Sequence, residues 1–189
     1  LDASGRPIEH SSWHASVFAA AFGLVPSSRR PTLLAFFRRR GMVGSVYASF
    51  FCLQALYRLQ ADHGQLALEM LTSSAKHSWQ NMILQGATAT MEAWATDEKP
   101  NLSWSHPWAS APASAVVWGL FGVRAVQPAW RAIEVRPQPG NLSWATIRVP
   151  SARGPISLGF NQTVNHSFDL VLDAPEKTDA TVCLPRLGL

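Results

Sequence analysis

The sequence predicts an α+β fold in which a block of helices precedes a set of strands. Hydrophobic residues recur with a period near 3.6 over the first two-thirds of the chain. After about Pro128 they alternate with a period of two, between turns rich in Pro, Gly and Asn. Strands that follow a run of helices are typical of an α+β fold or of two domains. We therefore expect a helical domain over residues 1–127 and a β domain over residues 128–189.

The expected helices are short and have recognisable ends. They cover residues 13–23, 31–39, 45–60, 65–71, 79–84 and 113–121. Gly23, Gly41 and Gly122 end three of them, and Ser110 and Pro112 supply a cap and a first-turn proline for the last. The segment 45–60 is the most strongly periodic. Helices of this length, paired by short turns, predict stacked αα-hairpins rather than a compact bundle.

The expected strands are the alternating segments of the last third. They cover residues 133–135, 145–149, 156–160, 168–172 and 181–184.

Charge and hydropathy argue against two classes of partner. The formal net charge is +4, and its densest part, Arg29, Arg30 and Arg38 to Arg40, brackets one short helix without aromatic residues between the charges. We expect solvated helix ends there rather than nucleic-acid contacts. No apolar run approaches the roughly 20 residues that a membrane span needs.

No signal peptide opens the chain, and its first residues are expected to be the interior of a longer protein.

The two cysteines, Cys52 and Cys183, have no metal-ligand spacing. Two buried free thiols are the expected state, and a long-range disulfide between them is the alternative. We expect no metal and no other cofactor.

Four of the five asparagines begin a glycosylation sequon: Asn101, Asn141, Asn161 and Asn165. Only Asn81 lies outside one. This enrichment favours a secreted eukaryotic glycoprotein.

A polar and aromatic segment between the helices and the strands has the composition of a catalytic loop. Its Glu92 is flanked by the hydroxyls of Thr88 and Thr90 and by the ring of Trp94, which are surroundings suited to a general base. His106 could orient that carboxylate or bind a sugar hydroxyl. Indole rings beside polar groups, at Trp79, Trp94, Trp104 and Trp108, can stack on a pyranose. A salt-bridged glutamate and a packing histidine remain the alternative on the residues alone.

The order of motifs resembles glycoside hydrolase family 78, the α-L-rhamnosidases. The resemblance is carried by Gly86-Ala-Thr-Ala-Thr-Met-Glu92-Ala-Trp94, then Lys99-Pro100-Asn101, Trp104 and His106-Pro-Trp108. Flanking segments agree in the same order, among them Glu9-His10-Ser-Ser-Trp13, Gly41-Met42-Val-Gly-Ser45 and Arg136-Pro-Gln-Pro139-Gly140. The similarity covers nearly the whole chain.

This resemblance implies part of an (α/α) toroid followed by an antiparallel β-sandwich. It implies inverting hydrolysis of terminal α-L-rhamnosides without a catalytic metal. Glu92 would be the general base, with His106 beside it as a catalytic residue. Trp94, Trp104, Trp108 and Lys99 would bind the sugar.

Three departures from the family pattern leave two interpretations. The carboxylate-rich segment that holds the general acid lies upstream in the family and has no counterpart in this chain. Ala89 replaces a threonine, and Asn101 places a sequon beside the pocket. The first interpretation is the C-terminal part of a secreted rhamnosidase, completed by an N-terminal portion or a companion chain. The second is a catalytically silent homologue, kept as a structural or carbohydrate-binding glycoprotein in an extracellular assembly.

Overall fold

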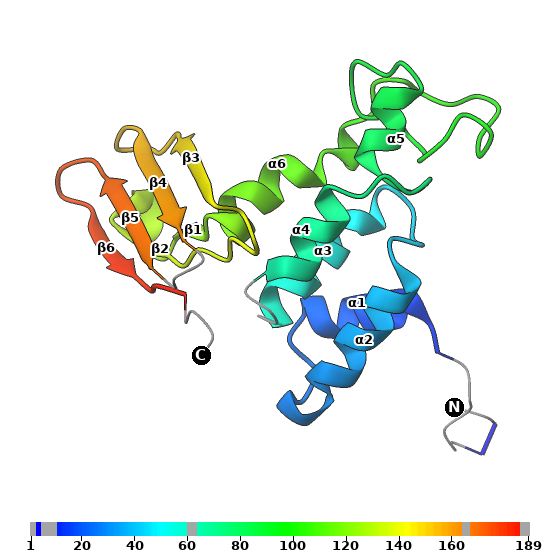
Figure 1. Cartoon of the computed structure of the whole chain (residues 1–189), viewed down its shortest axis with the longest axis horizontal. Helices are drawn as coiled ribbons and strands as arrows, with labels where there is room; N and C mark the ends of the chain where they lie inside the picture. Colours follow the sequence, from blue (N-terminus) through cyan, green and yellow to red (C-terminus); the bar gives the residue numbers. More distant parts are fainter. Residues whose placement is uncertain (1–2, 5–10, 60–63, 164–166, 186–189) are drawn as a thin grey trace.

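The computed structural model describes residues 3–4, 11–59, 64–163 and 167–185. It confirms the α+β fold class. Helices occupy one side of the molecule and two small sheets the other, with α6 (Ala111–Ala115) between them (Figure 1). None of the described helices is long and apolar enough to cross a membrane.

The helices lie where the hydrophobic period predicts them. They are α1 (Trp13–Ala21), α2 (Arg30–Arg40), α3 (Ala48–Leu59), α4 (Gln65–Leu71), α5 (Trp79–Leu84) and α6. Short helical turns are η1 (Ser27–Arg29), η3 (Pro107–Ala109), η4 (Val116–Leu120) and η5 (Pro128–Trp130). The last turn of α2 carries Arg38, Arg39 and Arg40, where cations interact favourably with the helix dipole.

Three helix starts differ from the expectation: α2 begins one residue earlier, at Arg30, and α3 and α6 differ by two or three residues. α3 begins at Ala48 instead of residue 45, and the Ser45 hydroxyl accepts a hydrogen bond from the Ala48 amide (3.3 Å). Ser110 does not cap α6 with its side chain, and its hydroxyl lies 3.2 Å from that of Thr90. The predicted helix over 113–121 is instead the short α6 followed by the π-helical turn η4.

The strands are β1 (Val123–Ala125), β2 (Ala132–Val135), β3 (Trp144–Val149), β4 (Ile156–Gln162), β5 (Phe168–Asp173) and β6 (Asp179–Val182). They form two three-stranded sheets in the orders β1-β2-β6 and β3-β4-β5. β2 and β6 pair in parallel, so one sheet departs from the antiparallel pattern that the resemblance implies. β1 was not expected, and it lies before residue 128.

Buried side chains link the helices and the sheets into one core. α1 packs on α3, and the Trp13 indole nitrogen donates to the Gly41 carbonyl (3.0 Å). The sheets contribute Ile133 and Val135 from β2 and Ile156, Leu158 and Phe160 from β4.

The segment that follows β2 fastens the sheets to the helices. The Gln138 amide nitrogen donates to the Tyr57 carbonyl of α3 (3.0 Å), and the Gln138 backbone donates to Leu120 (2.8 Å). Pro137, Gln138 and Pro139 are buried in this joint. The two parts therefore share a packed interface.

Both cysteines are free thiols. Cys52 is buried as expected, and burial raises the pKa of its thiol to about 12. Cys183 is only half-buried, because it follows the edge strand β6.

Candidate active site

The loop between α5 and η3 projects from the helical part, on the side away from the sheets (Figure 1). It begins at Gly86, whose φ of +92° ends α5 in a conformation that side-chain-bearing residues rarely adopt. Two paired segments shape it. The Glu92 amide donates to the Ser103 carbonyl (2.9 Å), and the His106 amide donates to the Thr90 carbonyl (2.7 Å). These bonds bring Glu92 and His106 to neighbouring positions of one closed loop.

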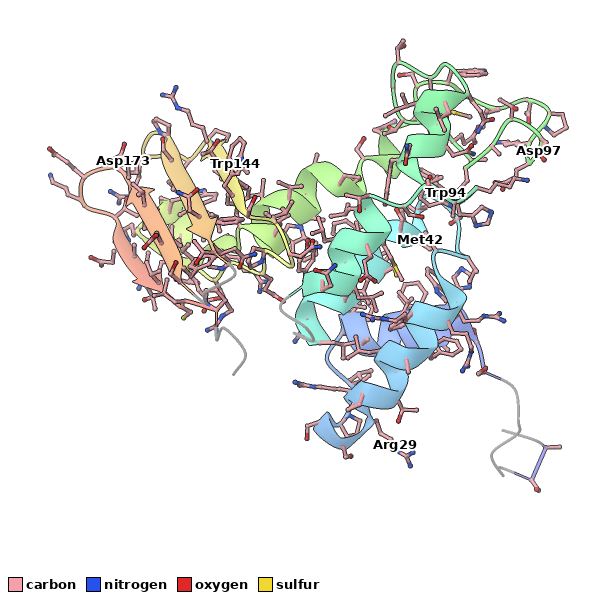
Figure 2. The ribbon with its side chains drawn as sticks, in the orientation of Figure 1. Arg29, Met42, Trp94, Asp97, Trp144 and Asp173 are labelled. Carbon is pink, nitrogen blue, oxygen red and sulfur yellow. The ribbon has the colours of Figure 1, made fainter. Side chains whose placement is uncertain are left out.

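Two large side chains of the loop point into the core. Met91 is fully buried, and Trp94 is only 2% exposed. The Trp94 indole nitrogen donates to the Gly44 carbonyl (2.7 Å). Figure 2 shows Trp94 beside Met42, with Asp97 farther out on the loop. The buried pair anchors the loop, and Glu92 between them is left at the surface.

The Glu92 carboxylate is held by two partners. Its Oε1 forms an ion pair with the Lys99 ammonium, and its Oε2 accepts the Ser103 backbone N–H (3.1 Å). The hydrogen bond from Lys99, followed by that from Ser103, lowers the pKa of the Glu92 carboxyl from its ordinary value. Glu92 is therefore ionised at neutral pH, as a general base must be.

His106 does not hydrogen-bond to Glu92. Its Nε2 is buried and has no hydrogen-bond partner among the described residues. Its ring lies 5.0 Å from that of Trp108 in an edge arrangement, and the Trp108 ring lies 5.3 Å from Tyr47. A buried imidazole nitrogen without a partner is costly, so this atom is suited to a ligand hydroxyl or to a group from another chain segment.

The predicted aromatic residues divide into exposed and buried ones. Trp104 is 47% exposed and Trp108 61% exposed, so both present ring surface to a ligand. Tyr47, Phe50, Phe51 and Trp108 line an open hollow of about 350 Å³. Trp94 was expected to line a sugar pocket, but the chain encloses its ring, which is only 2% exposed. Trp79 supports it edge-on at 5.1 Å and donates to the Ala109 carbonyl (2.7 Å).

Two further contacts bear on the expectations for this loop. The Thr90 hydroxyl donates to the His106 carbonyl (2.8 Å) and so ties the loop together instead of orienting Glu92. Lys99, expected to bind the sugar, is paired with Glu92. Sequence reasoning also missed Ser103, His77 and Tyr47. Ser103 enters the sequence pattern only as the last residue of the Asn101 sequon, Tyr47 only as the end of a flanking segment that resembles the family, and His77 lies in no pattern that singles it out.

The two acidic residues near Glu92 have structural partners. Asp97 pairs with Lys76 (2.9 Å), and Glu98 accepts hydrogen bonds from His77 (2.9 Å) and from the Trp94 amide (3.2 Å). Both carboxylates are therefore engaged in ion pairs among the described residues. Among the described residues, no cluster of three or more His, Cys, Asp and Glu could hold a metal ion.

Three of the four sequons fall within the described residues. Asn101 is exposed in the Glu92 loop, Asn141 is exposed in the turn before β3, and Asn161 is exposed on β4. Asn165 lies outside the described residues.

Comparisons with known proteins agree across both parts of the chain. Residues 1–117 match the family model of the bacterial α-L-rhamnosidase 6 hairpin glycosidase domain, and residues 122–188 match that of the bacterial α-L-rhamnosidase C-terminal domain. No curated protein sequence matches significantly.

Three solved structures of similar fold are those of α-L-rhamnosidases. That of Aspergillus terreus is 22% identical with a TM-score of 0.80, over 91% of this chain and 21% of its own. That of Dictyoglomus thermophilum is 22% identical with a TM-score of 0.79, over 94% and 21%. The family 78 rhamnosidase of Bacillus sp. GL1 is 26% identical with a TM-score of 0.76, over 97% and 20%. The chain thus spans about one fifth of the length of these relatives.

Proposed function

The chain belongs to the α-L-rhamnosidase family, and from this premise we propose that it is the C-terminal part of an inverting rhamnosidase whose general base is Glu92. One observation carries the assignment. Glu92 is an ionised, partly exposed carboxylate, and it lies in the loop that also bears His106 and the exposed Trp104 and Trp108.

The proposed chemistry needs a water molecule beside Glu92. The carboxylate takes a proton from this water as its oxygen attacks the anomeric carbon, and the bond to the leaving oxygen breaks on the opposite side. Lys99 and Ser103 each occupy one lone pair of a different oxygen, and each carboxylate oxygen has another to offer to water. Lys99 keeps the base ionised, while the exposed indole rings support the sugar.

No described residue is assigned as the general acid. An inverting pair needs a second carboxyl roughly 6.5–9.5 Å away, and Asp97 and Glu98 are engaged elsewhere. We propose that an N-terminal portion, on the same protein or on a companion chain, supplies this acid. The substrate would be a glycan or glycoside ending in α-L-rhamnose.

One observation favours the alternative, a catalytically silent homologue with a structural or carbohydrate-binding role. Lys99 and Ser103 hold both oxygens of Glu92 in the geometry of a structural ion pair. A carboxylate so engaged stabilises the loop whether or not it activates water.

The test is an aryl α-L-rhamnoside assay on the complete protein. Glu92→Gln keeps the size and most hydrogen bonds of the side chain but removes the charge that activates water. We expect kcat to fall about 10²- to 10⁴-fold with little change in KM. His106→Ala should lower kcat/KM less, because the base remains.

Glu176→Gln is the matched control, since Glu176 lies in the exposed turn between β5 and β6. It should retain wild-type activity. Near-full activity in Glu92→Gln would refute the assignment as base. An inactive but folded wild type would support the silent alternative.

We also propose that the protein is secreted and glycosylated. Asn141 should be modified most readily, because it lies exposed in a turn. Asn101 is expected to be modified least, because its sequon ends at Ser103, which is bonded to Glu92. Glycopeptide mass spectrometry of the native protein measures the occupancy. Finding all described sites empty would count against secretion.

A further inference from the structure

The Glu92 loop is fastened to the rest of the molecule at His77, which lies between α4 and α5. The His77 Nδ1 is 2.8 Å from the Met42 carbonyl oxygen, and its Nε2 is 2.9 Å from Glu98 Oε1. Both side chains are partly shielded, with 34% of His77 and 26% of Glu98 exposed. One imidazole thus bridges the segment after α2 and the loop that carries Glu92.

Both partners of His77 present oxygen atoms to its ring nitrogens. A carbonyl oxygen can only accept a hydrogen bond, so Nδ1 must carry a proton to bond Met42. An ionised carboxylate is also only an acceptor, so Nε2 must carry a proton to bond Glu98. Only the doubly protonated ring can donate to both partners, and its bond to an ionised Glu98 is then charge-assisted.

The bridge continues to within two residues of Glu92. Glu98 Oε2 accepts the Trp94 amide (3.2 Å), and the Trp94 ring lies parallel to the His77 ring, with centroids 6.1 Å apart. The Trp94 indole donates to Gly44, so the loop is attached twice to the segment 42–44. Movement of the His77–Glu98 pair would therefore shift the backbone at Trp94, and with it the orientation of the Glu92 side chain two residues away.

We propose that His77 and Glu98 are positioning residues, a charged clasp that holds the Glu92 loop against the segment 42–44. This inference rests on the proposed role of Glu92 for its effect on rate, but the clasp itself does not. The other charged groups near it are Lys76, which contacts both Asp97 (2.9 Å) and Glu98 (3.8 Å), and Arg38, Arg40 and Glu69, which line the hollow beside His77.

The first experiment counts protons on His77. The complete protein, labelled with ¹⁵N-histidine, is studied by NMR at neutral pH, with the His77→Gln spectrum assigning the signals. We expect both ring nitrogens of His77 to be protonated in the wild type. In Glu98→Gln, the amide N–H₂ can donate to Nε2, so we expect that nitrogen to lose its proton. An unprotonated Nε2 in the wild type would overturn the charged clasp.

The second experiment measures the effect on catalysis. A shift of about 1 Å in a catalytic group can cost about 10²-fold in rate. We expect His77→Gln and Glu98→Gln each to lower kcat roughly 10- to 100-fold with KM nearly unchanged. His14→Gln, at an exposed histidine of α1, is the control.

The two measurements separate the clasp from the proposed function. Unchanged kcat in both variants would overturn the positioning role. If the wild type has no rhamnosidase activity, the proposed function falls, and the proton count still decides whether the clasp exists. Should His77→Gln fail to fold, Glu98→Gln carries both tests, because its side chain keeps the size of the original and the histidine signals that it changes are those of His77.

Discussion

At Glu92, two oxygens of one carboxylate have different kinds of partner, a mobile ammonium and a fixed backbone amide. The amide belongs to Ser103, whose carbonyl in turn accepts the Glu92 N–H, so this contact is part of the loop itself. Lys99 is the partner that a substitution can remove without breaking the loop. It is also the largest cause of the lowered pKa of Glu92.

We predict that Lys99→Met moves the acidic limb of the pH–rate profile to higher pH. Lys99 lowers the pKa of Glu92, and a general base works only when deprotonated, so activity is lost as pH falls through that pKa. Removing the ammonium raises the pKa toward its ordinary value. Activity should then disappear at a higher pH than in the wild type.

The same ion pair makes a pH-dependent contribution to stability. Because the folded-state pKa of Glu92 is lowered, this contribution is present above the pKa of the unfolded carboxyl and is lost as pH falls through the folded value.

Profiles of kcat/KM against pH for wild type, Lys99→Met and the exposed control Lys177→Met measure the catalytic effect. An acidic limb that does not move in Lys99→Met would show that Lys99 does not tune the base.

Individual residues in the loop also mark the limit of sequence reasoning. The motif placed Glu92 in a loop with His106, because residue types and spacing are local information. The burial of Trp94 was not predicted, because an indole beside polar residues is equally compatible with a core and with a sugar platform. Its orientation depends on Gly44 and His77, which lie far away in sequence.

At the level of elements, long periodic segments were predicted well and short ones poorly. α3 places many apolar side chains on one face, so its period of 3.6 is visible in the sequence. β1 has three residues, which is too few for an alternation to be detected. The parallel pairing of β2 with β6 joins residues that are distant in the chain, and no local pattern specifies it.

The turn η4 offers a prediction at this scale. A Cβ on Gly119 would overlap the ring of Tyr57, which is fully buried. Alanine gains about 1 kcal/mol over glycine in helix propensity, but overpacking a core costs about 1–3 kcal/mol. Tyr57 is also packed edge-on against Trp118 and cannot move aside. We therefore expect Gly119→Ala to lower the free energy of unfolding.

Thermal unfolding of the complete protein measures this change. Gly159→Ala on β4 is the matched control, because its Cβ would make ordinary contact with Thr146 at 3.4 Å. Gly159→Ala should leave the melting temperature nearly unchanged. A Gly119→Ala protein that melts at or above the wild-type temperature would mean that η4 adjusts to admit the methyl group.

For the molecule as a whole, we consider an aromatic face over α1, α3 and η3 that is left exposed to solvent. It consists of Phe18, Phe22, Tyr47, Phe51 and Trp108, whose rings contact one another in a continuous series. Phe22 is 60% exposed and Trp108 61% exposed. Contiguous apolar surface of this kind is uncommon on a soluble monomer and marks a surface that binds another.

We predict that this chain, prepared alone, associates or precipitates. The solved relatives are about five times as long, and further polypeptide packed on the aromatic face would remove its rings from water. Size-exclusion chromatography with light scattering measures the mass of the particle, with and without the N-terminal portion present.

The double variant Phe22→Ser, Trp108→Ser should associate less, because it removes the two most exposed rings of the face. The variant Trp144→Ser is the control, since Trp144 is equally exposed but lies on β3, away from this face. A monodisperse monomer with cooperative unfolding would contradict the prediction, because it would show that the chain is stable in water with its aromatic face uncovered.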